Sequence, residues 1–289
     1  KIIRLMIPKS LSLIAWQVNL YIFAVVGMRM MEGGLAAFNF ASNIQSFAVS
    51  LFGIAFATAV FPSLNSAASK NDKKEFTRNF QNTLHRILFF TIPATIGVMI
   101  LAKPITDLIL GGGEFGSNSL DMTSIILLFF AISIPFESLT HLFARSFYAM
   151  KNTMTPMIIN IFSLTIVALI TIFIAPVYGI EWFSIGFAIG FGIYNILFVI
   201  IIRKHLKGFN FKKFTGSLSK IIFSALLMGV ILYMTVDLYE LIDLNEKIVH
   251  CLRIAIGGAT YLLSAYFLKS PELESVNYIL QRLFKKTNV

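Results

Sequence analysis

GGLAAFNFASNIQSFAVSLFGIAFATAVFP, residues 33–62, is a long apolar stretch without a charged residue. At a rise of about 1.5 Å per residue, it is long enough to cross a bilayer as a helix, which takes roughly 20 apolar residues. The amides Asn43 and Gln45 interrupt its first half, and small residues recur throughout, so that neighbouring helices can approach closely. The stretch predicts a membrane-spanning helix that lines a polar space inside a bundle.

The composition places the whole chain in the same class. Hydrophobic residues make up 57% of it and charged residues 13%, against about 45–50% and about 25% in soluble domains. A soluble chain of 289 residues could not cover that much apolar surface, which indicates a polytopic membrane protein. The single Cys251 excludes an internal disulfide and a cysteine metal cluster.

Apolar segments of spanning length recur along the chain, and we expect an all-α fold with eight transmembrane helices. Their predicted positions are about 8–28, 36–62, 85–103, 120–149, 155–175, 182–202, 217–236 and 249–268.

Two further segments look amphipathic. Residues 71–86 place Phe76, Phe80 and Leu84 on one stripe among basic residues, which predicts a helix lying on the membrane surface. The tail, residues 271–289, has a similar stripe. Pro62 is expected to mark the end of the second span.

Lysine and arginine gather on one side of these spans. Eight spans put both termini on the same side, and only Arg29, Lys103, Lys247 and Arg253 fall on the other, which leaves 20 of the 24 with the termini. Such an excess marks the cytoplasm, so we expect both termini there. The net charge of +10 then reflects topology and attraction to anionic headgroups, and no nucleic-acid partner is expected.

Four segments, in order, resemble the MurJ/MviN family, the lipid II flippases of the MOP exporter superfamily. They are WQVNLYIF (16–23), FASNIQSFAVSLFGIAFATAVFPSL (40–64), LAKPITDLILGGGEF (101–115) and ARSFYAMKNTMTP (144–156). The resemblance implies a fold of two six-helix lobes that face a central cavity, followed by two extra helices that form a groove for a lipid tail. Residues 1–205 would be the C-terminal lobe. Residues 206–289 would be a linker, the two additional helices and an amphipathic cytoplasmic tail, and an N-terminal lobe would precede this chain.

The resemblance also implies a function. A bacterial inner-membrane flippase would move lipid II, an undecaprenyl-pyrophosphate-linked peptidoglycan precursor, from the cytoplasmic to the periplasmic leaflet by alternating access. Its partners would be lipid II, membrane lipids and the N-terminal lobe, without a cofactor. The chain departs from the family at Asn43, where Arg is common, and at His141, where Lys is common.

Three other functions stay open at this point. A drug or polysaccharide exporter of the same superfamily fits the departure at Asn43. A polytopic transferase acting on polyprenyl lipids would need carboxylate or histidine groups at a membrane face, and the chain has no HExxH, Walker A or GxSxG motif, so we expect no enzyme. A membrane scaffold would not need ionisable groups inside a span.

Such groups do occur in the fourth predicted span. Glu137, His141 and Arg145 follow one another at intervals of four residues and share one helix face. Each charge in hydrocarbon costs about 3 kcal/mol, which pairing along the face would lower. The three side chains either line a cavity, where they meet a charged headgroup or relay a proton, or form an ion pair that fixes helix packing. We favour the cavity.

Neutral amides inside the spans are weaker candidates for substrate binding. Asn19, Asn43 and Gln45 could contact a polar headgroup, or they could form hydrogen bonds between helices, worth about 0.6–2 kcal/mol each. The second interpretation is favoured for Gln45, and the two are even for Asn19 and Asn43.

Overall fold

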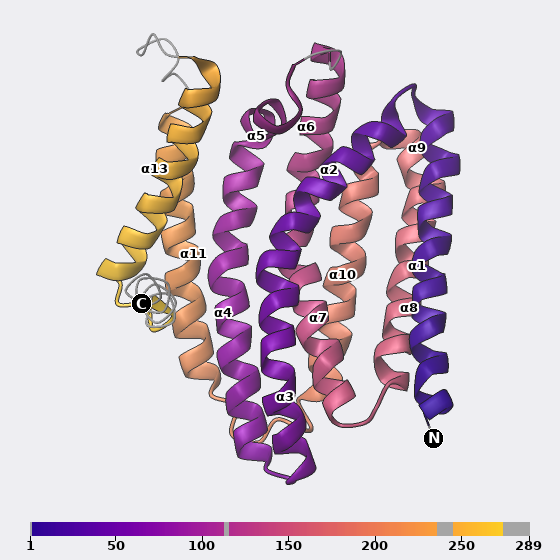
Figure 1. The fold of residues 1–289 in the computed structure, drawn as a ribbon, viewed down its shortest axis with the longest axis vertical. Helices are drawn as coiled ribbons and strands as arrows, with labels where there is room; N and C mark the ends of the chain where they lie inside the picture. The colour runs from indigo at the N-terminus through magenta and orange to yellow at the C-terminus, as the bar shows by residue number, and fades with distance from the viewer. Residues whose placement is uncertain (1, 113–115, 236–244, 274–289) are drawn as a thin grey trace, which may run out of the picture.

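The computed structural model describes residues 2–112, 116–235 and 245–273, and every regular element in these ranges is helical (Figure 1). The elements in chain order are α1 (Ile2–Met30), α2 (Gly34–Ala48), the π-helical η1 (Val49–Ile54), α3 (Ala55–Ser69), α4 (Lys73–Ile100), α5 (Ala102–Leu110), α6 (Ser117–Ala131), α7 (Ser133–Ala149), α8 (Met154–Leu169), the π-helical η2 (Ile170–Ile174), α9 (Ala175–Tyr178), α10 (Glu181–Ile202), α11 (Phe211–Met234) and α13 (Glu246–Phe267).

The predicted all-α polytopic fold is confirmed. Seven helical segments of the described chain are long and apolar enough to cross a membrane, and the bent pair α6–α7 makes eight if it counts as one span. These segments correspond one for one to the eight predicted spans. The fourth differs from a simple helix, because it bends by 49° at the break between α6 and α7.

The prediction of a surface helix over residues 71–86 is wrong. These residues begin α4, which continues without interruption to Ile100. Phe76, Phe80 and Leu84 are buried in a core cluster with side chains of α3, α7 and α10. An apolar stripe has the same spacing whether it faces lipid or other helices. Most of the predicted tail, residues 274–289, lies outside the described part of the chain.

The prediction that the second span ends at Pro62 is also wrong. Pro62 lies inside α3, which continues to Ser69. A proline within a membrane helix is tolerated where its surroundings satisfy the freed carbonyl group. Lys70 caps the helix after Ser69, and Asn71 in the turn that follows takes a positive φ of 55°. The Asp72 side chain then accepts hydrogen bonds from the amides of Lys74 and Glu75 and caps α4.

The helices form an upright bundle, with α1 and α8 near one edge and the pair α11 and α13 at the other (Figure 1). α11 packs against both α4 and α13. Phe89 of α4 joins a separate apolar cluster with side chains of α11 and α13, and the Tyr261 hydroxyl of α13 donates to the Phe89 carbonyl oxygen at 2.6 Å. The boundary between a lobe and a helix pair at residue 205 stays a prediction.

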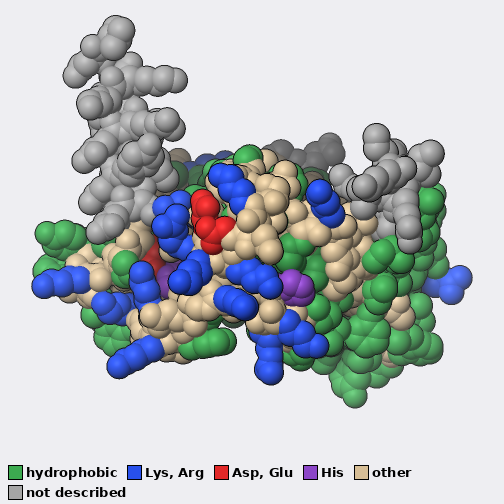
Figure 2. Space-filling view, turned by 90° about the horizontal axis from the view of Figure 1, so that it is seen from below, with side chains coloured by type: hydrophobic (Ala, Val, Ile, Leu, Met, Phe, Trp, Pro, Cys, Tyr) green, Lys and Arg blue, Asp and Glu red, His purple; other side chains and the backbone are tan. Residues whose placement is uncertain are grey.

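Basic side chains gather at one end of the bundle. Figure 2 looks at the end where the N-terminus and the α3–α4 turn lie, and lysine and arginine cover much of it. Lys70 lies in the α3–α4 turn, and Lys73 and Lys74 begin α4. The basic residues that the sequence placed on one side of the spans thus lie at one end of the fold. This distribution agrees with the predicted topology, in which that end faces the cytoplasm.

Candidate substrate cavity

A cavity of about 390 Å³ lies among the spans, between α1, the α2–η1 segment, α7, α8 and α10. Glu137 and His141 on α7 both line it, so two of the three predicted ionisable side chains face the same space. Its other lining residues are Ser12, Leu13, Trp16, Ser46, Val49, Ser50, Ile54, Thr140, Ala144, Tyr148, Pro156, Asn160, Phe191 and Tyr194. The wall is therefore apolar in part, with hydroxyl, amide, carboxyl and imidazole groups set into it.

Glu137 is held by a neutral partner on the second span. Gln45 of α2 is 1% exposed, and its Nε2 atom donates to Glu137 Oε2 at 2.8 Å and lies 3.1 Å from Ser133 Oγ. Ser133 in turn donates to the Phe130 carbonyl oxygen at 2.8 Å. Gln45 does not line the cavity. Its role in the structure is the hydrogen bond between helices that the sequence favoured, which positions the carboxyl group of Glu137.

Arg145 lies beyond the cavity wall and turns toward α3. Its Nη2 atom donates to Thr58 Oγ1 at 2.9 Å, and Nη1 lies 3.4 Å from the His141 carbonyl oxygen. Among the described residues, no ion pair joins Glu137 to His141 or Arg145. The alternative interpretation, an ion pair along this face, is therefore not supported by the described residues, because Glu137 and Arg145 each form a hydrogen bond with the second span instead.

The two asparagines lie apart from this group. Asn19 is buried, at 4% exposure, and its Nδ2 atom donates to the Ala15 carbonyl oxygen one turn earlier at 3.1 Å. Asn43 is exposed. Neither side chain lines the cavity. Their assignment to substrate binding stays a prediction that the shape of this cavity does not support.

Other polar groups of the wall were missed by sequence reasoning. Asn160 of α8 is an amide inside a predicted span, so the signal that singled out Asn43 applied to it equally. Tyr194 of α10, interpreted from the sequence as a packing residue, lines the cavity and also stacks on Phe198 with ring centroids 5.4 Å apart. Ser46 and Thr140 gave no signal in the sequence, because small hydroxyl residues are common wherever membrane helices pack closely.

Irregular helices border the cavity on two sides. The π-helical η1 contributes Val49, Ser50 and Ile54 to the wall, and the break between α6 and α7 lies one turn before Glu137. Gly53 of η1 packs directly against Ser138, where an added Cβ atom would lie 2.6 Å from the Ser138 Cα atom. π-Helical turns are frequent at functional sites, and here the irregular turn packs the second span closely against α7.

Comparison with known proteins agrees with this arrangement. The family model described as lipid II flippase MurJ matches residues 1–247. The lipid II flippase MurJ of Thermosipho africanus is 31% identical over 196 residues, which are 68% of this chain and 38% of that protein. The probable lipid II flippase MurJ of Thermotoga maritima is 23% identical over 94% of this chain and 54% of its own length.

A solved structure supports the same relationship. The structure titled lipid II flippase MurJ, inward closed conformation, superposes with a TM-score of 0.76 at 25% sequence identity, over 89% of this chain and 52% of that chain. The chain thus spans about half the length of that protein, and 38% of the Thermosipho africanus relative. With a family model that matches most of its residues, the chain belongs to the MurJ lipid II flippase family.

Proposed function

We propose that this chain is the C-terminal part of a lipid II flippase of the bacterial inner membrane. Residues 1–205 form the lobe that supplies one wall of a central cavity, an N-terminal lobe supplies the other, and residues 206–289 add the helix pair. The headgroup of lipid II crosses between the lobes by alternating access while its tail stays in the membrane. The flippase performs no covalent chemistry and uses no cofactor.

One observation carries this proposal most directly. Glu137 and His141 line a cavity between spans, although ionisable groups at this depth are costly and usually serve a transport path. A scaffold would gain nothing from such groups. The lining hydroxyl and amide groups of Thr140, Tyr148 and Asn160 add donors and acceptors that suit a sugar and peptide headgroup.

Arg145 is the group we assign to the pyrophosphate of the substrate. A guanidinium group binds phosphate oxygens through two parallel hydrogen bonds. In this structure its Nη2 atom donates to the neutral hydroxyl group of Thr58 instead, a hydrogen bond from a charged donor that is worth about 1.5–3 kcal/mol. A charged phosphate is the stronger partner, so a modest rotation of the side chain would exchange one for the other.

A polysaccharide or drug exporter of the same superfamily is the second candidate. It is favoured by Asn43, which is exposed and neutral at a position where the family commonly has Arg. The two candidates differ in the role of Arg145. Lipid II has phosphate groups that a guanidinium group can bind through two hydrogen bonds, whereas a drug without phosphate offers no such partner.

Complementation separates these functions. The complete native protein, expressed in a strain depleted of its own flippase, should restore growth and translocation of labelled lipid II. The Arg145→Lys variant keeps the charge without the fork and should restore translocation only in part. Export of a drug or polysaccharide without lipid II translocation would establish the exporter instead.

The orientation of the chain belongs to the same proposal. The basic end shown in Figure 2 faces the cytoplasm in this proposal, and the excess of lysine and arginine predicts both termini on that side. Lipid II is made on that side, so the cavity must open toward the basic end to receive it.

A further inference from the structure

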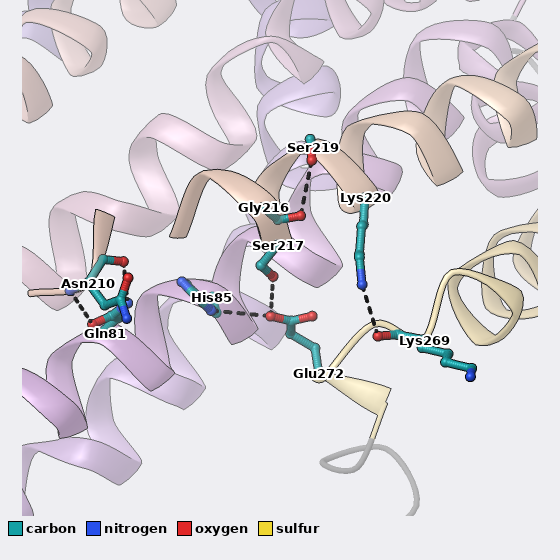
Figure 3. Close-up of polar contacts among 9 residues, drawn as sticks. All are labelled: Gln81, His85, Asn210, Gly216, Ser217, Ser219, Lys220, Lys269 and Glu272. Carbon is teal, nitrogen blue, oxygen red and sulfur yellow. Dashed lines mark hydrogen bonds and ion pairs between the residues drawn. The ribbon is translucent and has the colours of Figure 1, made fainter. Parts of the chain in front are cut away.

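A second set of buried ionisable groups lies away from the cavity, where α4, α11 and the segment after α13 meet (Figure 3). His85 of α4 and Glu272, which follows α13, are 6% and 5% exposed. His85 Nδ1 lies 3.2 Å from Glu272 Oε1, and the Ser217 hydroxyl of α11 donates to the same oxygen. A single carboxylate oxygen thus joins three segments that are far apart in the sequence.

The order of these groups excludes a hydrolytic triad. In a triad, histidine lies between the serine and the acid and takes the hydroxyl proton. Here Glu272 lies between His85 and Ser217, and the imidazole ring instead contacts Phe214, with ring centroids 5.4 Å apart. Ser217 therefore has no histidine beside it to take its proton, and we interpret the cluster as one that holds segments together.

Neighbouring polar contacts lie on either side of this cluster. One turn earlier on α4, Gln81 Nε2 donates to the Asn210 carbonyl oxygen at 3.2 Å, and the Asn210 amide lies 3.4 Å from Gln81 Oε1. On the other side, Lys220 Nζ donates to the Lys269 carbonyl oxygen at 3.3 Å. Figure 3 shows the three contacts in a row along the start of α11.

The rest of the interface with α4 is mainly apolar. Farther along α4 and α11, apolar side chains pack together, and a Cβ atom added at Gly229 would lie 2.9 Å from Ile96. The hydrogen bond from the Tyr261 hydroxyl to the Phe89 carbonyl oxygen, described above, is a second directional contact between the helix pair and α4. Apolar burial is not directional, so it holds two helices together without fixing one position along the interface. Hydrogen bonds to a buried carboxylate do fix it, because their distances and angles are restricted.

We propose that Glu272 is a clamp that fixes the α11–α13 helix pair to α4, so that the pair and the helices around the cavity stay docked during the working cycle of the protein. The proposal does not depend on which lipid is transported. Removing the hydrogen-bond partner of a buried carboxylate leaves its charge uncompensated, and this makes separation of the segments much easier. Burial alone would raise the pKa of Glu272, but the hydrogen bonds from His85 and Ser217 outweigh it and lower that pKa, so the carboxylate stays charged in the clamp.

A cysteine reporter beside the clamp tests this directly. Ser270 is 4% exposed, and its hydroxyl has no hydrogen-bond partner among the described residues, so Ser270→Cys removes no bond. The reporter is placed in the complete native protein in growing cells, with the exposed Cys251 replaced by serine. The rate of its modification by N-ethylmaleimide then measures how often the segment after α13 leaves α4.

The clamp predicts slow modification in the parent protein. Glu272→Ala and His85→Ala should each raise the rate at least about tenfold, which corresponds to about 1.4 kcal/mol, and the double variant should raise it no further because both changes break one interaction. The control variants Glu75→Gln and His205→Ala, at an acid and a histidine outside the cluster, should leave the rate unchanged. Unchanged rates in both clamp variants, or effects that simply add, would overturn the proposal.

A second reporter separates local release from general unfolding. Ser163 of α8 is 2% exposed and also lacks a hydrogen-bond partner in the described ranges, so Ser163→Cys should stay unmodified when only the clamp opens. If both reporters become reactive in the alanine variants, the milder Ser217→Ala variant decides. It removes one donor and keeps the His85 contact. A rise at Ser270→Cys alone then supports the clamp, and no rise there refutes it.

Discussion

Replacing Gly53 by alanine should push the second span away from α7 at the point where it borders the cavity. The added Cβ atom would lie 2.6 Å from Ser138 Cα, 2.7 Å from its Cβ and 2.8 Å from its Oγ. Ordinary contacts of a Cβ atom begin at 3.4 Å, so the two helices must separate by several tenths of an ångström. The first of the three atoms is backbone and cannot rotate away.

The expected cost follows from two opposing effects. Overpacking of a well-packed interior costs about 1–3 kcal/mol, while alanine in place of glycine inside a helix returns about 0.5–1 kcal/mol. Gly53→Ala should therefore destabilise the protein by up to about 2.5 kcal/mol. Gly192→Ala is the matched control, because Gly192 is also helical and an added Cβ atom there meets nothing within 4 Å.

Thermal unfolding of the purified complete protein measures both variants. We expect a lower midpoint for Gly53→Ala and an equal or higher one for Gly192→Ala. A Gly53→Ala variant as stable as the parent would refute the close contact between η1 and α7. In that case the π-helical segment would not be fitted against Ser138 in the way that the structure describes.

Three further predictions concern separate parts of the chain. Gln45→Leu leaves Glu137 without its hydrogen-bond donor and should cost about 1–3 kcal/mol in thermal unfolding, whereas Asn43→Leu, at an exposed side chain, should cost less than about 0.5 kcal/mol. Because the pKa of Glu272 is lowered from 4.5, its stabilising contribution is complete above that pH and is lost as the pH falls through the folded-state pKa. In the Glu272→Gln variant, stability should therefore fall less between neutral and acid pH than in the parent protein. An equal fall in both proteins would contradict a charged Glu272 in the folded state. A Lys212→Cys variant in a Cys251→Ser background should react with an impermeant maleimide only after the membrane is opened, and labelling of intact cells from outside would reverse the proposed orientation.

The transmembrane helices were predictable because length and hydropathy alone define them. All eight predicted spans have a counterpart in the structure. The same reasoning failed at Phe76, Phe80 and Leu84, since an apolar stripe next to basic residues fits a membrane surface and a helix interface equally well. Only the position of the neighbouring helices decides between them, and no local pattern contains that information.

The sequence predicted which helix face carries the candidate site, but it did not predict the hydrogen-bond partners of that face. Intervals of four residues placed Glu137 and His141 on one face, and both line the cavity. The partner of Glu137 is Gln45, 92 residues away in the sequence, and the partner of Arg145 is Thr58 on α3. Such pairings depend on how the spans pack, so the sequence could not identify either partner. The contact between His85 and Glu272 was missed for the same reason.

The central claim is that the ionisable face of α7 serves transport rather than folding. Its most direct test is lipid II translocation measured together with membrane abundance in the complete protein carrying Arg145→Ala or Glu137→Gln. Arg203→Ala, an exposed arginine at the end of α10, is the control. Abundance should stay at the parent level while translocation falls at least about tenfold in both variants and not in the control, a loss of about 1.4 kcal/mol in transition-state stabilisation. A parallel fall of abundance and translocation, or full translocation in both variants, would contradict it.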